Sequence, residues 1–136
     1  MVIPVLREQG FKGSFPHFRR CNENNIDLIT FQFNKWGGSL VVELASCPED
    51  GTTMYWGEKI PLNKVNALHI NKRFKLGAKS LEEDGIWFNY EKAESEEDYS
   101  KVAVRVLNQL KTSDTYWISS RLRSSLFWKF LRNRNS

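Results

Sequence analysis

The sequence predicts an α+β domain: an antiparallel sheet of about five strands with two or three helices packed on it. Three observations support this class. Apolar and polar residues alternate between residues 15 and 47, turn-forming residues divide that stretch, and apolar residues recur at helical spacing between residues 99 and 110. With 136 residues, of which 40% are hydrophobic, the chain is long enough to bury one core. We therefore expect a single domain over residues 1–136.

The first ten residues are typical of a short helix. Residues 2–9 hold Pro4 in the first turn, where proline is tolerated because no backbone N–H is needed there. Gly10 follows at a position where helices commonly end. We expect the sheet to begin after this glycine.

Three strands are expected next, in the form of an antiparallel meander. An asparagine-rich turn at residues 22–25 separates the first strand from the second, and Gly37-Gly38 separates the second from the third. The strands themselves are expected at residues 15–21, 26–36 and 39–47.

Tight turns would determine which residues of these strands face each other. One turn sets Arg20 opposite Asp27, an opposite-charge pair that favours the alignment, and the other sets Trp36 opposite Ser39. Because side chains alternate between the two faces of a strand, one face collects apolar residues and is the expected core. Its members are Phe18, Ile29, Phe31, Phe33, Leu40, Val42 and Leu44.

The middle of the chain is less regular. Residues 48–68 show little periodicity and are expected to form a long irregular connection. A fourth strand is expected from His69 to Gly77 and a fifth from Ile86 to Tyr90. Alternation in the fourth strand places Ile70, Phe74 and Leu76 on one side.

A second helix is expected after residue 95. Ser95-Glu96-Glu97-Asp98 is typical of a capping box, and its acidic residues lie where the helix dipole favours negative charge. The apolar stripe that follows should pack on the sheet. It consists of Tyr99, Val102, Ala103, Val106, Leu107 and Leu110.

Residues 118–136 form a C-terminal segment that is both apolar and basic, beyond the remainder of the domain at 1–117. On a helical wheel its apolar residues fall on every side, so a helix here would need to be covered on more than one side. Two interpretations stay open. The segment packs within the monomer, or it is an interface for self-association or for a protein partner.

Charge is unevenly distributed along the chain, although 20 Lys and Arg against 16 Asp and Glu give a net charge of only +4. Residues 82–98 hold eight acidic side chains and one lysine, whereas residues 99–136 hold eight basic side chains and one aspartate. The acidic stretch is expected to be a solvated turn and helix cap, with contact to the basic end as the alternative.

Known catalytic and metal-binding patterns are missing from the sequence. We find no phosphate-binding glycine loop, nucleophile elbow or zinc-protease motif, and therefore expect no enzyme, no metal and no cofactor. Cys21 and Cys47 lack a Cys-x-x-Cys spacing and are expected to be free thiols. The start lacks the basic region of a signal peptide and no long apolar run is present, so we expect a cytoplasmic location without a membrane partner.

The face of the sheet opposite the expected core gathers polar and aromatic residues. The register sets Gln32 opposite Glu43, because each lies four residues further from the Gly37-Gly38 turn than the expected pair Trp36 and Ser39. Exposed tryptophan beside arginine is typical of surfaces that bind partners or stack on bases, whereas a merely solvated or partly covered face is the alternative. The candidate binding residues are Arg19, Gln32, Trp36, Glu43, Arg73, Lys75 and Trp87.

Several short segments also match a known pattern: Gly10-Phe11-Lys12, His17-Phe18-Arg19-Arg20, Thr30-Phe31-Gln32, Arg73-x-Lys75-Leu76-Gly77 and Trp87-Phe88. Through them the chain resembles, from about residue 2 to residue 117, a bacterial family catalogued as number 4304 of the domains of unknown function. The resemblance implies a small α+β domain without assigned catalysis, similar in build to immunity or accessory proteins. The residues that match the family pattern are Phe11, Phe31, Gln32, Arg73, Gly77 and Trp87.

Together these observations predict a non-catalytic protein-binding module of immunity or accessory type. Its partner would be an unidentified protein or a second copy, bound through the C-terminal segment. The alternative is a basic domain that binds single-stranded nucleic acid.

Overall fold

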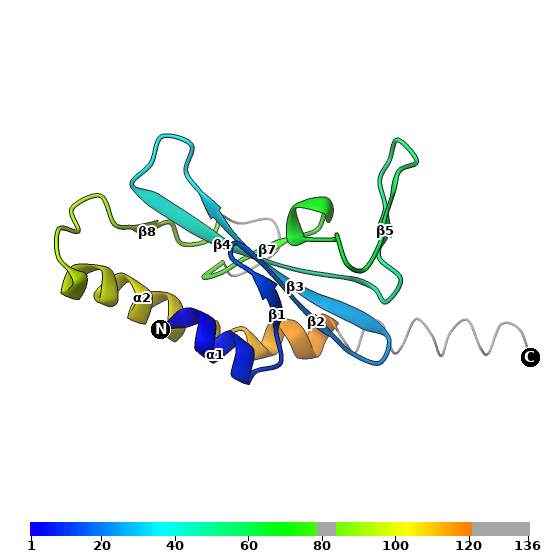
Figure 1. The fold of residues 1–136 in the computed structure, drawn as a ribbon, viewed down its shortest axis with the longest axis horizontal. Coiled ribbons are helices and arrows are strands. Elements are labelled where there is room, and N and C mark those ends of the chain that lie inside the picture. The colour runs from blue at the N-terminus through cyan, green and yellow to red at the C-terminus, as the bar shows by residue number, and fades with distance from the viewer. Residues whose placement is uncertain (79–83, 121–136) are drawn as a thin grey trace, which may run out of the picture.

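The computed structural model describes residues 1–78 and 84–120, and its centre is a six-stranded antiparallel sheet (Figure 1). The strand order is β1-β2-β3-β4-β7, and β8 pairs with β4 beside β7. Helices accompany the sheet, so the α+β prediction is confirmed. The strands of this sheet are β1 (Lys12–Ser14), β2 (His17–Cys21), β3 (Asn25–Phe33), β4 (Ser39–Pro48), β7 (Phe74–Lys75) and β8 (Phe88–Asn89).

Helices lie on one side of this sheet and a smaller irregular layer on the other (Figure 1). The helical side consists of α1 (Val2–Glu8), α2 (Glu96–Lys111) and a helix over residues 114–120, where the described chain ends. The other side holds the short 3-10 helix η1 (Ala67–His69) and a two-stranded ribbon of β5 (Thr52–Thr53) and β6 (Lys59–Ile60).

The register of the first hairpin confirms the sequence prediction, whereas that of the second corrects it. Arg20 lies opposite Asp27, as expected. In the second hairpin, however, Gln32 pairs with Val41 and not with Glu43, whose partner is Thr30. Both predicted pairs, Gln32 with Glu43 and Trp36 with Ser39, are therefore wrong.

The correction follows from a longer turn than a two-residue glycine hairpin. The N–H of Asn34 donates to the carbonyl of Ser39 at 2.9 Å, so residues 35–38 form a four-residue loop. Gly37 and Gly38 both adopt positive φ, at 82° and 81°, which glycine tolerates and other residues do not. The register shifts by two residues, and because the pleat repeats every two residues, each side chain stays on its predicted face.

The helical side of the sheet holds the main core. Most residues of the predicted apolar face are buried there, and α1 and α2 cover them. Phe33 is an exception, because it lies at the end of β3 and is 45% exposed. The buried cluster comprises Leu6, Phe11, Phe18, Ile29, Phe31, Val42, Leu44, Leu76, Phe88, Val106, Leu110 and Trp117.

A second, smaller core covers the opposite face and was not expected. Part of the segment predicted as an irregular connection, residues 48–68, packs onto this face. Ile70 packs against this cluster, so its predicted place on the same side as Phe74 is wrong. The predicted fourth strand began at His69, but Ile70 directly follows η1 and β7 begins only at Phe74. The cluster comprises Ile26, Leu28, Ala45, Cys47, Ile60, Val65 and Ala67.

Helix α2 begins as the capping box predicts. Ser95 Oγ accepts the N–H of Asp98 at 3.2 Å, and the Asp98 carboxylate accepts the N–H of Ser95 at 3.4 Å. Of the predicted stripe, Val106 and Leu110 are buried, whereas Tyr99 is about half exposed. The helical prediction for the C-terminal segment lies largely outside the described residues.

Candidate functional site

Four polar side chains form one row across the face opposite the main core. His17, Thr30, Glu43 and Lys75 lie directly opposite one another on β2, β3, β4 and β7. Two of them, Glu43 and Lys75, belong to the candidate binding residues. The strands thus bring part of the predicted set together, in a register different from the predicted one.

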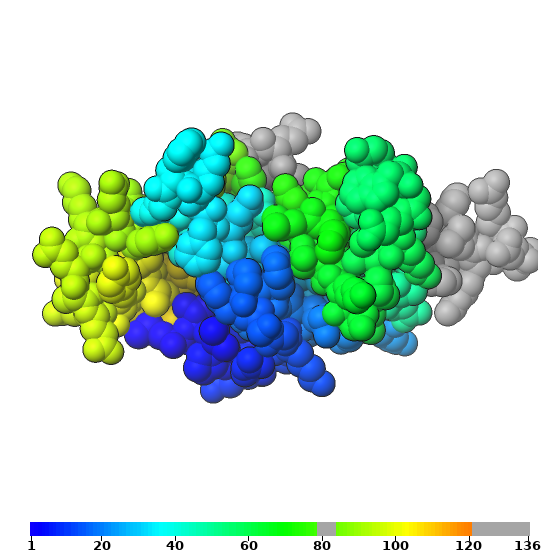
Figure 2. Space-filling view, turned by 45° about the horizontal axis from the view of Figure 1, so that its top comes forward, coloured from blue at the N-terminus to red at the C-terminus, as the bar shows by residue number. Residues whose placement is uncertain are grey.

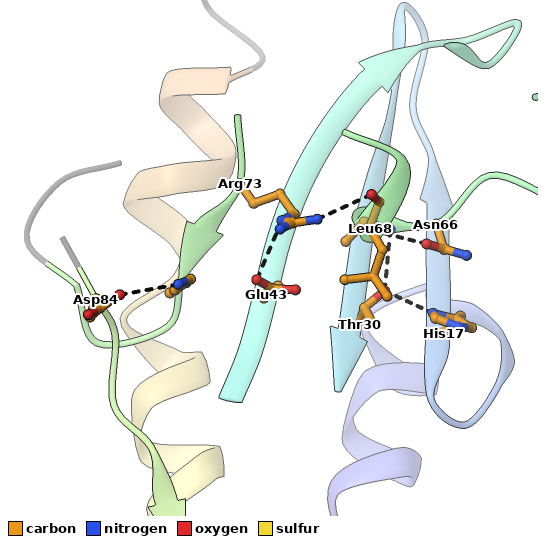
Figure 3. A network of polar contacts seen from close by, with 9 residues as sticks. His17, Thr30, Glu43, Asn66, Leu68, Arg73 and Asp84 are labelled. Atoms are coloured by element: carbon orange, nitrogen blue, oxygen red, sulfur yellow. Dashed lines mark hydrogen bonds and ion pairs between the residues drawn. The ribbon is translucent and has the colours of Figure 1, made fainter. Parts of the chain in front are cut away.

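The Thr30 hydroxyl connects the row to the layer above it (Figure 3). It accepts the N–H of Ala67 at 3.2 Å and lies 3.0 Å from Nδ1 of His17. A hydroxyl can donate one hydrogen bond and accept two, so the direction of the bond between Thr30 and His17 depends on the tautomer of His17. Burial, together with the nearby His69, lowers the pKa of His17 and favours the neutral imidazole. These contacts hold η1 to the sheet.

Glu43 is a buried carboxylate, 1% exposed, at the centre of this row. Its Oε1 lies 3.4 Å from Nε of Arg73, and Nη1 of Arg73 donates to the carbonyl of Leu68 at 3.2 Å (Figure 3). Its other oxygen, Oε2, is buried without a hydrogen-bond partner among the described residues. Arg73 therefore ties β4 to η1, and Glu43 presents no surface to a partner.

The remaining candidate residues are dispersed. Arg19 donates to the carbonyl of Asn63 at 3.3 Å, and Lys75 Nζ lies 3.2 Å from the Asp84 carboxylate. Trp36 stands at the tip of the β3–β4 hairpin and is 84% exposed. Gln32 and Trp87 are also at the surface, Trp87 only in part. The candidate residues thus share a face or a hairpin without forming one continuous site.

An apolar groove lies on the helical side of the sheet, where the main core opens to solvent. Its volume is about 580 Å³. In Figure 2 the yellow surface of α2 lies between the dark-blue N-terminal helix and the cyan β3–β4 hairpin. The lining residues are Met1, Val2, Ile3, Pro4, Phe15, Phe31, Phe33, Leu40, Tyr90, Tyr99, Val102, Ala103 and Val106.

Aromatic rings form one wall of this groove. The ring centroid of Phe15 lies 5.3 Å from that of Phe31 and 5.7 Å from that of Phe33, and Phe33 lies 6.4 Å from Tyr90. The sequence interpretation assigned Phe33 to the core and did not consider Phe15. The predicted strand continues to residue 36, whereas β3 ends at Phe33, so no signal in the sequence indicated that Phe33 lies at a strand end.

The rim of the groove beside α2 is charged. Tyr90 and Val102 line both the groove and an adjoining hollow, to which Glu91, Lys92, Asp98 and Lys101 also contribute. Over residues 91–101 five carboxylates stand against Lys92 and Lys101, so this stretch carries a net negative charge. The backbone N–H groups of Glu94 and Ser95 lower the pKa of Asp98, which keeps its carboxylate ionised.

The cysteine prediction can be compared with the described part of the chain. Cys21 and Cys47 are free, and burial raises the pKa of the Cys47 thiol to about 12. Among residues 1–78 and 84–120, no group of three or more potential ligands could hold a metal ion. In the same residues, none of the helices has the length and apolar character that crossing a bilayer requires.

The model of a family described as a domain of unknown function, DUF4304, matches residues 2–120. No curated protein and no solved structure matches the chain.

Proposed function

The chain belongs to the family described as a domain of unknown function, DUF4304, and from this premise we propose that it is a non-catalytic protein-binding module. Its docking surface is the apolar groove between α1, α2 and the end of β3. The partner is an amphipathic segment that places apolar side chains in the groove and basic side chains along its acidic rim.

The exposure of aromatic side chains around one hollow carries this proposal. Phe15, Phe33 and Tyr99 line the groove, and their side chains are 48%, 45% and 52% exposed. Contiguous apolar surface of this kind is costly in water and marks interaction sites. Aromatic residues are also enriched among those that dominate binding energy.

The rim determines what kind of segment fits. Carboxylates at residues 91–98 attract a partner with lysine or arginine beside its apolar residues. A helix with apolar residues three and four apart can fill such a groove while its basic side chains remain at the edge. An acidic or purely polar segment would be repelled or would leave the groove empty.

Peptide selection tests this proposal directly. We expect random 16-residue peptides selected on the full chain to share apolar residues at helical spacing together with lysine or arginine. Phe33→Asp should weaken binding of such a peptide at least about tenfold, equivalent to about 1.4 kcal/mol, in fluorescence polarisation. Trp36→Asp is the matched control, because this aromatic residue is exposed at the nearby hairpin tip and does not line the groove. Equal effects of both substitutions would contradict the proposal.

Binding of single-stranded nucleic acid is the second candidate, favoured by a basic hollow of about 410 Å³ to which Arg19 and Lys64 contribute. It ranks lower because Arg73 and Lys75 already pair with Glu43 and Asp84.

A labelled oligonucleotide distinguishes this candidate. Binding should fall steeply with salt as phosphate contacts are lost, and Trp87→Ala should cost about 1–3 kcal/mol if a base stacks on it. No anisotropy change at about 50 mM salt and micromolar protein would exclude this function.

A further inference from the structure

We infer that the segment bound in the apolar groove is residues 121–136 of a second copy of this chain. The inference rests on the proposed protein-binding function and names its partner. It follows from the composition of that segment, from the charge of the groove rim and from the place where the described chain ends.

The composition of residues 121–136 matches the chemistry required by the groove. Six residues are large and apolar, five are basic and none is acidic. The apolar residues are Leu122, Leu126, Phe127, Trp128, Phe130 and Leu131, and the basic ones are Arg121, Arg123, Lys129, Arg132 and Arg134.

The net charges of the segment and of the rim are opposite in sign. Residues 121–136 hold five basic side chains and no acidic one, whereas residues 91–101 hold five carboxylates and two lysines. Of these carboxylates, Asp98 is engaged in capping α2 and Glu97 lies 4.0 Å from Lys101, so the rim also has its own internal contacts. Glu91, Glu94 and Glu96 extend the acidic surface beyond these two.

The end of the described chain favours a second copy over the same chain. Trp117 packs on Phe11 with ring centroids 5.9 Å apart, and Tyr116 stacks on Phe74 at 5.2 Å; none of these four residues lines the groove. The groove instead lies at the start of α2, and the thirteen residues from Tyr99 to Lys111 span about 18 Å along the helix.

Reaching its own groove would require the chain to reverse direction after residue 120. Residues 118–136 contain no glycine and no proline, the two residues that most often produce such reversals. A second copy needs no reversal. An arrangement in which each copy supplies one segment and one groove is closed and symmetric, so both apolar surfaces are covered at once.

Cross-linking between isotopically distinct copies tests this arrangement. The full chain with p-benzoylphenylalanine in place of Phe33 is prepared in ¹⁴N and ¹⁵N forms, which are mixed in equal amounts, unfolded and refolded together. After irradiation, we expect mass spectrometry to find position 33 joined to residues 121–136, with about half of the linked pairs carrying mixed labels, as random pairing of two equal populations requires. Links to residues 121–136 with a single label only would overturn the inference by showing that each chain fills its own groove. Links to other regions, or none, would overturn it as well.

Sedimentation equilibrium of the full chain provides an independent measurement. We expect a dimer whose dissociation constant rises at least tenfold in Phe33→Asp and in Leu126→Asp, and rises with salt because the rim contacts are charged. Trp36→Asp, the exposed aromatic control, should leave the dissociation constant unchanged. A monomeric chain, or a dimer insensitive to Phe33→Asp, would overturn the inference. Peptide selection on the groove gives its result separately, so failure of self-association and failure of the protein-binding function are distinguishable.

Discussion

The two faces of the sheet are covered by different kinds of structure. Helices α1 and α2 cover one face, and their backbone groups are hydrogen-bonded within the helices. An irregular segment covers the other, and its backbone groups need individual partners from the sheet: Ala67 N–H bonds to Thr30, and the carbonyl groups of Asn63 and Leu68 accept from Arg19 and Arg73. The comparison shows that an irregular layer can cover a sheet when polar side chains of that sheet bind its backbone.

Each face also holds one buried carboxylate paired with an arginine. On the helical side, Asp27 Oδ2 lies 2.9 Å from Nε and 2.8 Å from Nη2 of Arg20, whose guanidinium lies 4.4 Å from the centre of the Phe11 ring. On the other side, Glu43 has a single, longer contact of 3.4 Å with Arg73. We expect the first pair to contribute more to stability.

The largest expected effect concerns the thiols of the irregularly covered face. Raising the pKa of Cys47 from 9.0 to about 12 lowers its thiolate fraction about 1000-fold at pH 8, so iodoacetamide should modify exposed Cys21 and spare Cys47. Peptide mapping after timed alkylation measures both rates. Both thiols should react in urea; equal rates in the folded protein would mean that the cover over Cys47 opens readily.

Removing Asp27, the carboxylate with the shorter contacts to its arginine, should produce the largest loss of stability. Asp27→Ala leaves Arg20 without its cross-strand partner in a mostly buried position, and we expect a loss of about 3 kcal/mol in urea unfolding. Asp84→Ala, which removes the exposed partner of Lys75, is the control and should cost about 0.5 kcal/mol or less. A small effect at both positions would remove the distinction between buried and exposed pairs.

Glu43→Gln should cost less than Asp27→Ala, about 1.5 kcal/mol, because glutamine keeps an acceptor for Arg73 and removes a buried charge with one unpartnered oxygen. The same urea unfolding measures it. Losses of equal size for the two substitutions would show that the faces depend equally on their ion pairs.

The helix cap gives a smaller effect that is confined to the helical side. Ser95→Ala removes the acceptor for the N–H of Asp98 and should cost about 1 kcal/mol, whereas Ser95→Asp should retain most of the stability. Alkylation of Cys47 should stay slow in both variants. If the alkylation rate rose in Ser95→Ala, the two layers would be coupled and not independent.

The smallest expected effect is a dependence on pH through His17. Its lowered pKa means that the folded state favours the neutral imidazole, so this contribution to stability is complete above the ordinary pKa of 6.5 and is lost as pH falls below it. The urea midpoint of the wild type should therefore fall more between pH 7.5 and pH 5 than that of His17→Gln. Parallel profiles would contradict the neutral hydrogen bond to Thr30.

The sequence by itself determined the elements that depend on local patterns. The alternation in β2, β3 and β4 predicted their faces, the asparagine-rich turn predicted the Arg20–Asp27 pair, and Ser95 with Asp98 predicted the start of α2. These features depend on residues close together in the chain, so spacing and residue type are sufficient to predict them. The shared face of Glu43 and Lys75 was predictable for the same reason.

Only the tertiary structure decided what covers each face and which surface stays open. The loop at residues 35–38 moved the partner of Glu43 from Gln32 to Thr30, since loop length depends on hydrogen bonds that two glycines alone do not specify. The segment at residues 48–68 has no periodicity, so its packing over the second face left no sequence signal. The groove, likewise, is formed where α1 and α2 lie beside Phe15 and Phe33. The meeting of such distant segments depends on the three-dimensional packing and not on any local pattern.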